Sequence, residues 1–233
     1  MGILTLVRHG QASFFSTDYD QLSDAGHAQS RALGEYWVRH EVTFDTLYVG
    51  PRRRHRQTLE GVAAVYAEHG LALPAPIEVP ELDEHDGLTV VRHVLRERGK
   101  LSDEPTPGDP GGAERERLVR SFFRHYLEIM NEWARGTVVV PAVEPWEEFR
   151  ARSLRGLDRM CVGAGNAAAF TSGGLVSSAT GWVLGLDDDR VLELSAAVRN
   201  TALTELRHSD RKRSLLTFNS LPHLPDPRTV TGV

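Results

Sequence analysis

The sequence predicts an α/β protein: a three-layer α/β/α sandwich with a mostly parallel central sheet and a helical cap insertion. Short apolar runs alternate with amphipathic helical patterns along most of the chain. The runs are continuous rather than alternating, which is typical of strands buried on both faces. A helical stretch at about residues 88–144 interrupts this alternation. We therefore expect one domain over residues 1–233, with that stretch as its cap.

The first predicted strand and helix come from the first forty residues. Residues 3–7 are apolar and end at the polar step Arg8-His9-Gly10, which predicts a short buried strand. Residues 10–22 hold small and polar side chains, so we expect a loop. Ser23 is a suitable N-cap, and apolar side chains recur after it on one helical face. A helix is predicted from there to about residue 40.

Two more strands are predicted at residues 46–49 and 77–79. Gly50 and Pro51 end the first of these, because glycine is a poor strand residue and proline cannot donate to the ladder. The apolar spacing of residues 53–68 fits one helical face. This segment is therefore predicted to be the helix that connects the second and third strands.

The predicted cap contains two helices and a loop. Residues 88–99 have a helical pattern, whereas residues 105–112 hold three prolines and three glycines and are predicted to be a loop. Residues 113–135 predict a long amphipathic helix. Its apolar stripe consists of Val119, Phe122, Phe123, Tyr126, Met130 and Trp133. We interpret this stripe as cap packing or a subunit contact, compatible with a homodimer, rather than as a cofactor site.

The last third of the chain returns to the sheet. Pro145 suits the first turn of a helix that extends to about residue 162. Beyond it we predict, in order, a strand at residues 167–171, a tight turn at Gly173-Gly174, a helix at residues 175–184, a solvated turn or helix N-cap at residues 187–189, and two strands between residues 201 and 219.

The composition excludes several classes of protein. With 27 basic and 32 acidic residues, the net charge is −5, and no strong single-sign field favours a nucleic-acid partner. The single cysteine, Cys161, cannot form an intrachain disulfide and argues against a cysteine-based metal site. No stretch approaches the ~18–20 apolar residues of a membrane helix, and the N-terminal run is too short for a signal peptide. We expect a cytoplasmic protein without a metal, a cofactor or a membrane partner.

The step Arg8-His9-Gly10 carries the most informative chemistry. It lies at the carboxyl end of the first predicted strand, where open α/β sheets bind ligands. A neutral imidazole attacks phosphorus readily, so His9 can form a covalent intermediate. Arg8 offers a forked guanidinium to phosphoryl oxygens. Taken alone, a His-Gly pair after a strand more often marks a simple turn.

Four further segments strengthen this interpretation. They are Leu22-Ser23-Asp24-Ala25-Gly26-His27-Ala28-Gln29 after the loop, Pro51-Arg52-Arg53-Arg54-His55-Arg56-Gln57-Thr58 after the second strand, Leu82-Asp83-Glu84 after the third, and Thr171-Ser172-Gly173-Gly174 after a later strand. All but the first lie at predicted strand ends. Because the ends of parallel strands meet at one edge of a sheet, we expect their side chains to converge on His9.

With these motifs in place, the sequence resembles the histidine phosphatase superfamily, the phosphoglycerate-mutase-like enzymes. The motifs are Arg-His-Gly, Leu-Ser/Thr-x-x-Gly-x-x-Gln, Pro-x-x-Arg-x-x-Gln-Thr and Leu-x-Glu. The resemblance covers residues 3 to about 90 and resumes near residue 166, continuing weakly to the end of the chain. Residues 91–165 match only in being a helical insertion.

The resemblance implies a role for each matching residue. His9 would be the nucleophile and would become phosphohistidine, while Arg8 and Arg54 would bind the phosphoryl group. Glu84 would be the general acid and then the general base, a role that suits a carboxyl shielded from water with a raised pKa. The residues implied to border the phosphate are Gln11, Ser13, Ser172 and Gly173.

One position departs from the family pattern. The family normally has Ser-His-Gly-Gly where this chain has Thr171-Ser172-Gly173-Gly174. Loss of a preorganised donor to a developing oxyanion costs ~10²–10³ in rate, and a hydroxyl in its place should cost less. His55, His85 and His223 are candidates to compensate. The remaining histidines we interpret as solvated, namely His27, His40, His69, His93, His125 and His208.

These residues support three hypotheses. The leading one is a phosphomonoester hydrolase that acts on a small phosphorylated substrate through His9. The alternative is a pseudo-phosphatase that binds inorganic phosphate or a phospho-ligand with little turnover, and Ser172 motivates it. A phosphoglycerate mutase is less favoured, because Gly10-Gln11-Ala12-Ser13-Phe14 lacks the Glu-Ser-x-Trp-Asn run of mutases.

Overall fold

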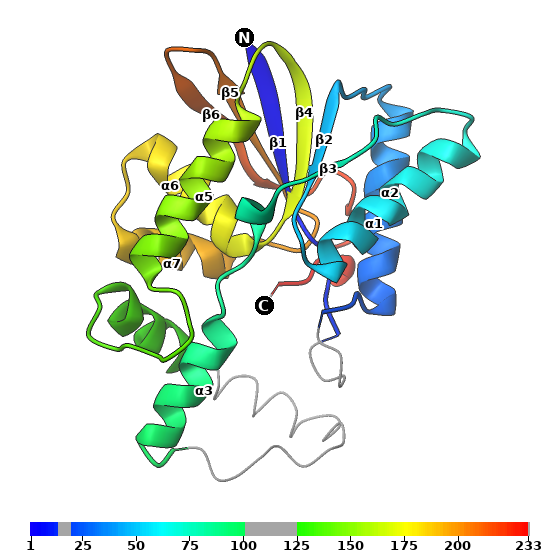
Figure 1. The fold of residues 1–233 in the computed structure, drawn as a ribbon. Helices are drawn as coiled ribbons and strands as arrows, with labels where there is room; N and C mark the ends of the chain where they lie inside the picture. Colours follow the sequence, from blue (N-terminus) through cyan, green and yellow to red (C-terminus); the bar gives the residue numbers. More distant parts are fainter. Residues whose placement is uncertain (14–19, 101–124, 233) are drawn as a thin grey trace.

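A six-stranded sheet is the centre of the computed structural model, which describes residues 1–13, 20–100 and 125–232 (Figure 1). The strand order is β3-β2-β4-β1-β5-β6. The strands are β1 (Gly2–Arg8), β2 (Thr46–Val49), β3 (Ile77–Glu78), β4 (Gly165–Thr171), β5 (Leu203–His208) and β6 (Arg213–Ser220). The first four are parallel, whereas β5 and β6 are antiparallel additions at one edge. The predicted mostly parallel sheet is confirmed.

Helices cover both faces of this sheet (Figure 1). On one face lie α1 (Asp24–Arg39) and α2 (Arg53–Glu68), which pack against each other. On the other lie α5 (Trp146–Met160), α6 (Gly173–Leu184) and α7 (Asp188–Ala197). The side chain of Ser23 accepts a hydrogen bond from the Gly26 amide, as expected for the N-cap of α1. The three-layer α/β arrangement is therefore confirmed.

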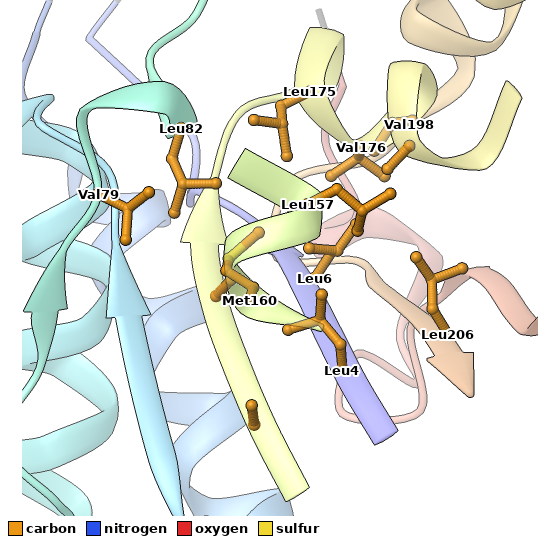
Figure 2. Packing of buried hydrophobic residues seen from close by; sticks show 13 residues of the cluster. Leu4, Leu6, Val79, Leu82, Leu157, Met160, Leu175, Val176, Val198 and Leu206 are labelled. Carbon is orange, nitrogen blue, oxygen red and sulfur yellow. The ribbon is translucent and has the colours of Figure 1, made fainter. Parts of the chain in front are cut away.

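Strand β4 separates two buried apolar cores. Ala167 and Ala169 face a core that includes Leu157 of α5 and Leu175 of α6. Ala168 and Phe170 face the opposite core, formed with α1 and α2. Figure 2 shows the first of these cores, with Leu4 and Leu6 of β1 beneath α6. Because side chains alternate across a strand, a continuous apolar run fills both layers.

A third apolar cluster belongs to the cap. It joins α3 (Gly87–Glu97) to the helical residues 125–134 and to the starts of α5 and α7. Its buried members are Val90, Val91, Val94, Leu95, Ile129, Met130, Trp133, Val140, Trp146, Phe149, Val191 and Leu192. Met130 and Trp133 of the predicted stripe are thus packed inside the chain. Val119, Phe122, Phe123 and the predicted loop at 105–112 lie outside the described residues.

The structure decides between the two predictions for residues 187–189 and adds two elements that were not predicted. Asp187 caps α7 by accepting a hydrogen bond from the Arg190 amide, so the aspartate run begins a helix. Two short 3₁₀ helices, η1 (Pro80–Leu82) and η2 (Pro227–Thr229), begin at prolines, whose fixed φ suits a first helical position. Among the residues that the structure describes, no helix is long and apolar enough to cross a membrane.

Candidate active site

His9 lies immediately after β1, in the middle of the sheet. Its backbone amide donates to the Thr171 carbonyl at 2.8 Å, which continues the pairing of β1 with β4. The next residue, Gly10, packs against α1, where a Cβ on Gly10 would lie 2.6 Å from the Gly26 carbonyl oxygen. His9 itself is only 4% exposed. Two neighbouring elements therefore fix the backbone that presents the imidazole.

The hydrogen bonds of His9 define its tautomer. Arg54 Nε lies 3.0 Å from His9 Nε2, and His9 Nδ1 lies 2.7 Å from the Gly10 carbonyl oxygen. A guanidinium always carries its hydrogens, so Nε2 must accept, and the hydrogen of a neutral ring is then on Nδ1. Burial, followed by the charges of Arg54 and Arg8, holds the pKa of His9 well below its usual value. The ring is therefore neutral, with its Nε2 lone pair directed at a cation.

Arg8 and Arg54 bring positive charge to this pocket, and both are buried. Arg8 Nη1 donates to the Val198 carbonyl, and its side chain runs beside Gly173 at the start of α6. Arg54, in the first turn of α2, contacts His9 through Nε and Asp20 through Nη1 at 2.9 Å. The pocket thus holds two guanidinium groups next to a neutral imidazole, an arrangement suited to an anion.

Asp20 is a site residue that the sequence did not reveal. One of its carboxylate oxygens accepts from Arg54 Nη1 and the other from the Arg53 amide, both at 2.9 Å. Arg52 is the N-cap of helix α2, and its side chain makes no capping hydrogen bond. The carboxylate therefore supplies the anion that a basic helix start requires. In the sequence, the one signal for an acidic partner is that no usual N-cap residue precedes this run of arginines.

Glu84 reaches the pocket from the segment that follows β3. Its Oε2 accepts from the Gly174 amide at 3.0 Å, and its Oε1 accepts from the His85 amide at 3.1 Å. The imidazole Nε2 of His85 lies 3.5 Å from Oε1. A Cβ on Gly174 would overlap Oε1, so only glycine leaves room for the carboxylate. The carboxylate is thereby fixed to the N-terminus of α6.

The expected raised pKa of Glu84 is wrong. Burial does raise it, but His85, the Gly174 amide and Arg54 together hold the pKa below its usual value. His85 itself is packed among aromatic rings of the cap, with ring centroids 5.1 Å from Phe149 and 5.7 Å from Trp133. The carboxyl is shielded from water as expected, but its partners stabilise the ionised form.

Gln11 and Ser13 lie in the loop after β1. The Gln11 amide donates to Gln29 Oε1 at 3.0 Å, and Gln11 Oε1 accepts from the Ser23 hydroxyl at 2.9 Å. The Ser13 amide donates to the Gln21 carbonyl at 2.9 Å. The side chain of Gln11 is therefore tied to the start of α1. The implied roles of both residues toward phosphate stay predictions.

Ser172 is fully buried between β4 and α6, and its hydroxyl pairs with His55, at 2.6 Å from Nε2. Of the three histidines considered as substitutes, His55 therefore meets Ser172 and His85 meets Glu84. His223 instead pairs with Thr201, whose hydroxyl oxygen lies 2.9 Å from His223 Nε2. The interpretation of His208 as solvated is wrong, because β5 buries it to 3% exposure.

The C-terminal tail fastens the backbone of His9. Asn200 Nδ2 donates to the His9 carbonyl at 3.0 Å, and the Asn200 side-chain oxygen accepts from the Thr231 hydroxyl at 2.9 Å. Gln29 Nε2 donates to the same hydroxyl at 2.8 Å. Thr201, fully buried, has a positive φ of 58°, which costs a β-branched residue about 1–3 kcal/mol and persists only under tertiary constraint. These contacts join residues far apart in sequence, so no local pattern predicted them.

Arg152 of α5 was also missed. Its Nη1 donates to the carbonyls of Glu81 at 3.0 Å and Asp83 at 2.9 Å, while its other nitrogens bind Glu144. This guanidinium therefore fixes the segment that carries Glu84. No metal-binding group of three or more His, Cys, Asp or Glu occurs within residues 1–13, 20–100 and 125–232.

The fold and this group of side chains together define a class of protein. Strand ends of a mostly parallel sheet bring together a neutral histidine, two buried arginines and a carboxylate held on a helix N-terminus. Such a set binds an anion and offers both a nucleophile and a proton-transfer group. The chain is thus an α/β protein with a candidate anion-binding site at its strand ends.

Comparison with known proteins specifies the family. The profile of the histidine phosphatase superfamily (branch 1) matches residues 4–91 and 108–221. The chain therefore belongs to the histidine phosphatase superfamily. No curated protein matches the sequence.

Solved structures show the same fold at low sequence identity. A phosphoglycerate mutase from Bacillus anthracis str. Sterne has a TM-score of 0.63 at 16% identity, covering 96% of this chain and 95% of that one. The alpha-ribazole phosphatase from Shigella flexneri has a TM-score of 0.59 at 17% identity, covering 94% and 96%. A mycobacterial glucosyl-3-phosphoglycerate phosphatase has a TM-score of 0.59 at 17% identity, covering 94% and 99%. Phosphatases and mutases thus share this architecture.

Proposed function

We propose that the protein is a phosphomonoester hydrolase that forms a phosphohistidine on His9. The observation that carries this proposal is the environment of His9 Nε2. The nitrogen is unprotonated, buried and 3.0 Å from Arg54 Nε, and Glu84 is anchored at the neighbouring strand end. A small phosphorylated molecule is the proposed substrate.

In the first step, His9 Nε2 attacks phosphorus, and the bond between phosphorus and the leaving oxygen breaks. Arg8 and Arg54 stabilise the charge on the phosphoryl oxygens. Glu84 gives a proton to the leaving oxygen. Because its pKa is held low in the free protein, we propose that this proton arrives with the substrate, since phosphate monoesters lose their second proton near pH ~6.

In the second step, water attacks the phosphoryl group on His9. Glu84, now ionised, accepts a proton from that water, and the bond between Nε2 and phosphorus breaks. Inorganic phosphate leaves and His9 returns to its neutral form. Burial of His9 and the positive charges of Arg54 and Arg8 favour this return, because both oppose protonation of the ring.

The test is hydrolysis of p-nitrophenyl phosphate by the purified chain, with mass spectrometry of peptides after a rapid acid-free quench. We expect turnover and a phosphoryl group on the His9 peptide, and we expect both to fall at least ~10³-fold in His9→Ala. His27→Ala is the matched control, because His27 is exposed on α1. Equal rates in His9→Ala and the parent protein would refute the proposal.

A phosphate-binding protein with little turnover is the second candidate, and Ser172 is the observation that favours it. It predicts saturable binding of inorganic phosphate by the parent protein, weakened in Arg54→Ala, without release of p-nitrophenol. A mutase assay with 3-phosphoglycerate and a bisphosphate primer separates the third possibility. Only transfer between the two carbon positions would support a mutase.

A further inference from the structure

The position of Ser172 is not simply a histidine site that has lost its histidine. The Ser172 hydroxyl lies 2.6 Å from Nε2 of His55, which comes from the first turn of α2. Both residues are completely buried. An imidazole from one helix is therefore joined to a hydroxyl at the start of another, at the carboxyl end of the sheet.

This imidazole belongs to the same pocket as the nucleophile. The ring centroids of His55 and His9 are 5.7 Å apart. Gly50, at the end of β2, makes the room, since a Cβ there would overlap His55 Nδ1. The missing side chain at Gly50, the serine at 172 and the histidine at 55 are thus sterically matched to one another.

We propose that Ser172 and His55 act as one donor to the phosphoryl group carried by His9. Ser172 is the residue that touches a phosphoryl oxygen, and His55 is a positioning residue that acts through it. The pair would supply from α2 the imidazole that most members of the family carry at position 172. This inference rests on the proposed function, because it assigns a part of the same site.

The proton positions explain how the pair can work. When the neutral His55 ring carries its hydrogen on Nδ1, the Ser172 hydroxyl donates to Nε2. Once His55 takes a proton from solvent, Nε2–H donates to Ser172 Oγ, and the hydroxyl hydrogen is released to a phosphoryl oxygen. No covalent bond to carbon or phosphorus forms or breaks at either residue.

The surrounding charges make this change depend on the anion. Burial and the cations Arg54, Arg52 and Arg56 of the α2 N-terminal region hold the pKa of His55 well below its usual value in the free protein. Among the described residues, the imidazole of His9, from the end of β1, also faces it. A phosphoryl group would offset the arginines, so the pKa of His55 would rise when the pocket is occupied.

The first experiment does not require turnover. The imidazole ¹⁵N signals of His55 are recorded while inorganic phosphate is added, with His55→Gln used to assign them. We expect a neutral ring without phosphate and a protonated ring at saturation, and we expect Ser172→Ala to reduce this change. A ring that stays neutral with its hydrogen on Nδ1 while phosphate is bound would overturn the pair, whatever the fate of the phosphatase proposal.

The second experiment measures kcat and KM for p-nitrophenyl phosphate in Ser172→Ala, His55→Gln, the double variant and the swap His55→Ala/Ser172→His. We expect each single change to lower kcat ~10²-fold with a small change in KM. The double variant should lose no more than the worse single variant, because coupled residues are not additive. The swap should restore kcat to within about tenfold of the parent protein, as the imidazole returns to position 172.

Three outcomes would contradict the pair. They are additive losses in the double variant, a parent-like kcat in His55→Gln, and a swap as slow as Ser172→Ala while its melting curve matches the parent. Glutamine keeps a neutral hydrogen bond but cannot take a proton, so a purely structural role for His55 predicts the second outcome. If the parent protein does not turn over, the proposed function fails and the ¹⁵N experiment alone decides the pair.

Discussion

At the scale of single residues, the pocket combines groups that oppose each other's ionisation. Burial, followed by the charges of Arg54 and Arg8, holds the pKa of His9 low and keeps the ring neutral, which makes it a nucleophile. The expected raised pKa of Glu84 was wrong because neighbouring groups outweigh the effect of burial. Sequence position indicated burial, which raises a carboxyl pKa, but it could not show the Gly174 amide or the His85 ring that lower it. The identity of a site residue was predictable, whereas its ionisation was not.

Asp20 gives a prediction at this scale. Its carboxylate neutralises part of the charge that Arg54 would offer to phosphate. Asp20→Asn should therefore lower the KM for p-nitrophenyl phosphate about fivefold, equivalent to about 1 kcal/mol. Asparagine can still accept from the Arg53 amide, so the start of α2 should remain intact. Asp24→Asn, in the exposed first turn of α1, is the control. An unchanged or higher KM would show that Asp20 does not compete for Arg54.

At the scale of elements, the N-terminus of α6 holds the carboxylate in place. Helix N-termini have free amide groups and attract anions, and here the Gly174 amide binds Glu84 at 3.0 Å. The sequence predicted the strand, the glycine pair and the helix in the correct order. It assigned the glycines to a turn beside phosphate and did not reveal that one of them makes room for Glu84.

The two glycines can be separated by experiment. Gly174→Ala would place a methyl group against Glu84 Oε1, so we expect kcat to fall at least ~10²-fold, as for loss of a general acid. A Cβ on Gly173 would meet no atom closer than 3.5 Å, so Gly173→Ala should cost much less. Steady-state kinetics of both variants, with melting curves, provide the measurement. Similar losses in the two variants would contradict this account of Gly174.

At the scale of the whole molecule, local pattern and topology rules predicted most of the fold. Apolar periodicity located the strands, and the rule that parallel strand ends meet brought His9, Arg54, Glu84 and Ser172 to one edge. The contacts made by Asn200 were not predictable, because they join distant segments through ordinary side chains. Helix α7 was predicted only as a possible N-cap at residues 187–189, because its apolar face is short. Its N-cap run was compatible with a simple turn.

The buried histidines predict how stability depends on pH. Burial lowers the pKa values of His9, His55 and His208, and that of His223 to about 4. The unfolded chain takes up protons near pH ~6.5 that the folded chain refuses, so stability is complete above that pH and falls as pH falls below it.

His223 alone should contribute about 2 kcal/mol to this loss by pH 5. Urea unfolding at pH 7, 6 and 5 measures it, and His223→Gln should flatten the curve relative to the parent protein. A free energy of unfolding that is constant from pH 7 to 5 would contradict the burial of neutral histidines.

The hydrogen bonds that link the His9 backbone to Asn200 and Thr231 have a consequence for how the protein folds during synthesis. Ribosomes synthesise a chain from its N-terminus, so the loop that carries His9 emerges among the first residues. Its carbonyl is held by Asn200, and Asn200 is held by Thr231. A nascent chain cannot complete its pocket until residue 231 has left the exit tunnel. The nucleophile is thus translated more than 200 residues before the threonine that completes its support.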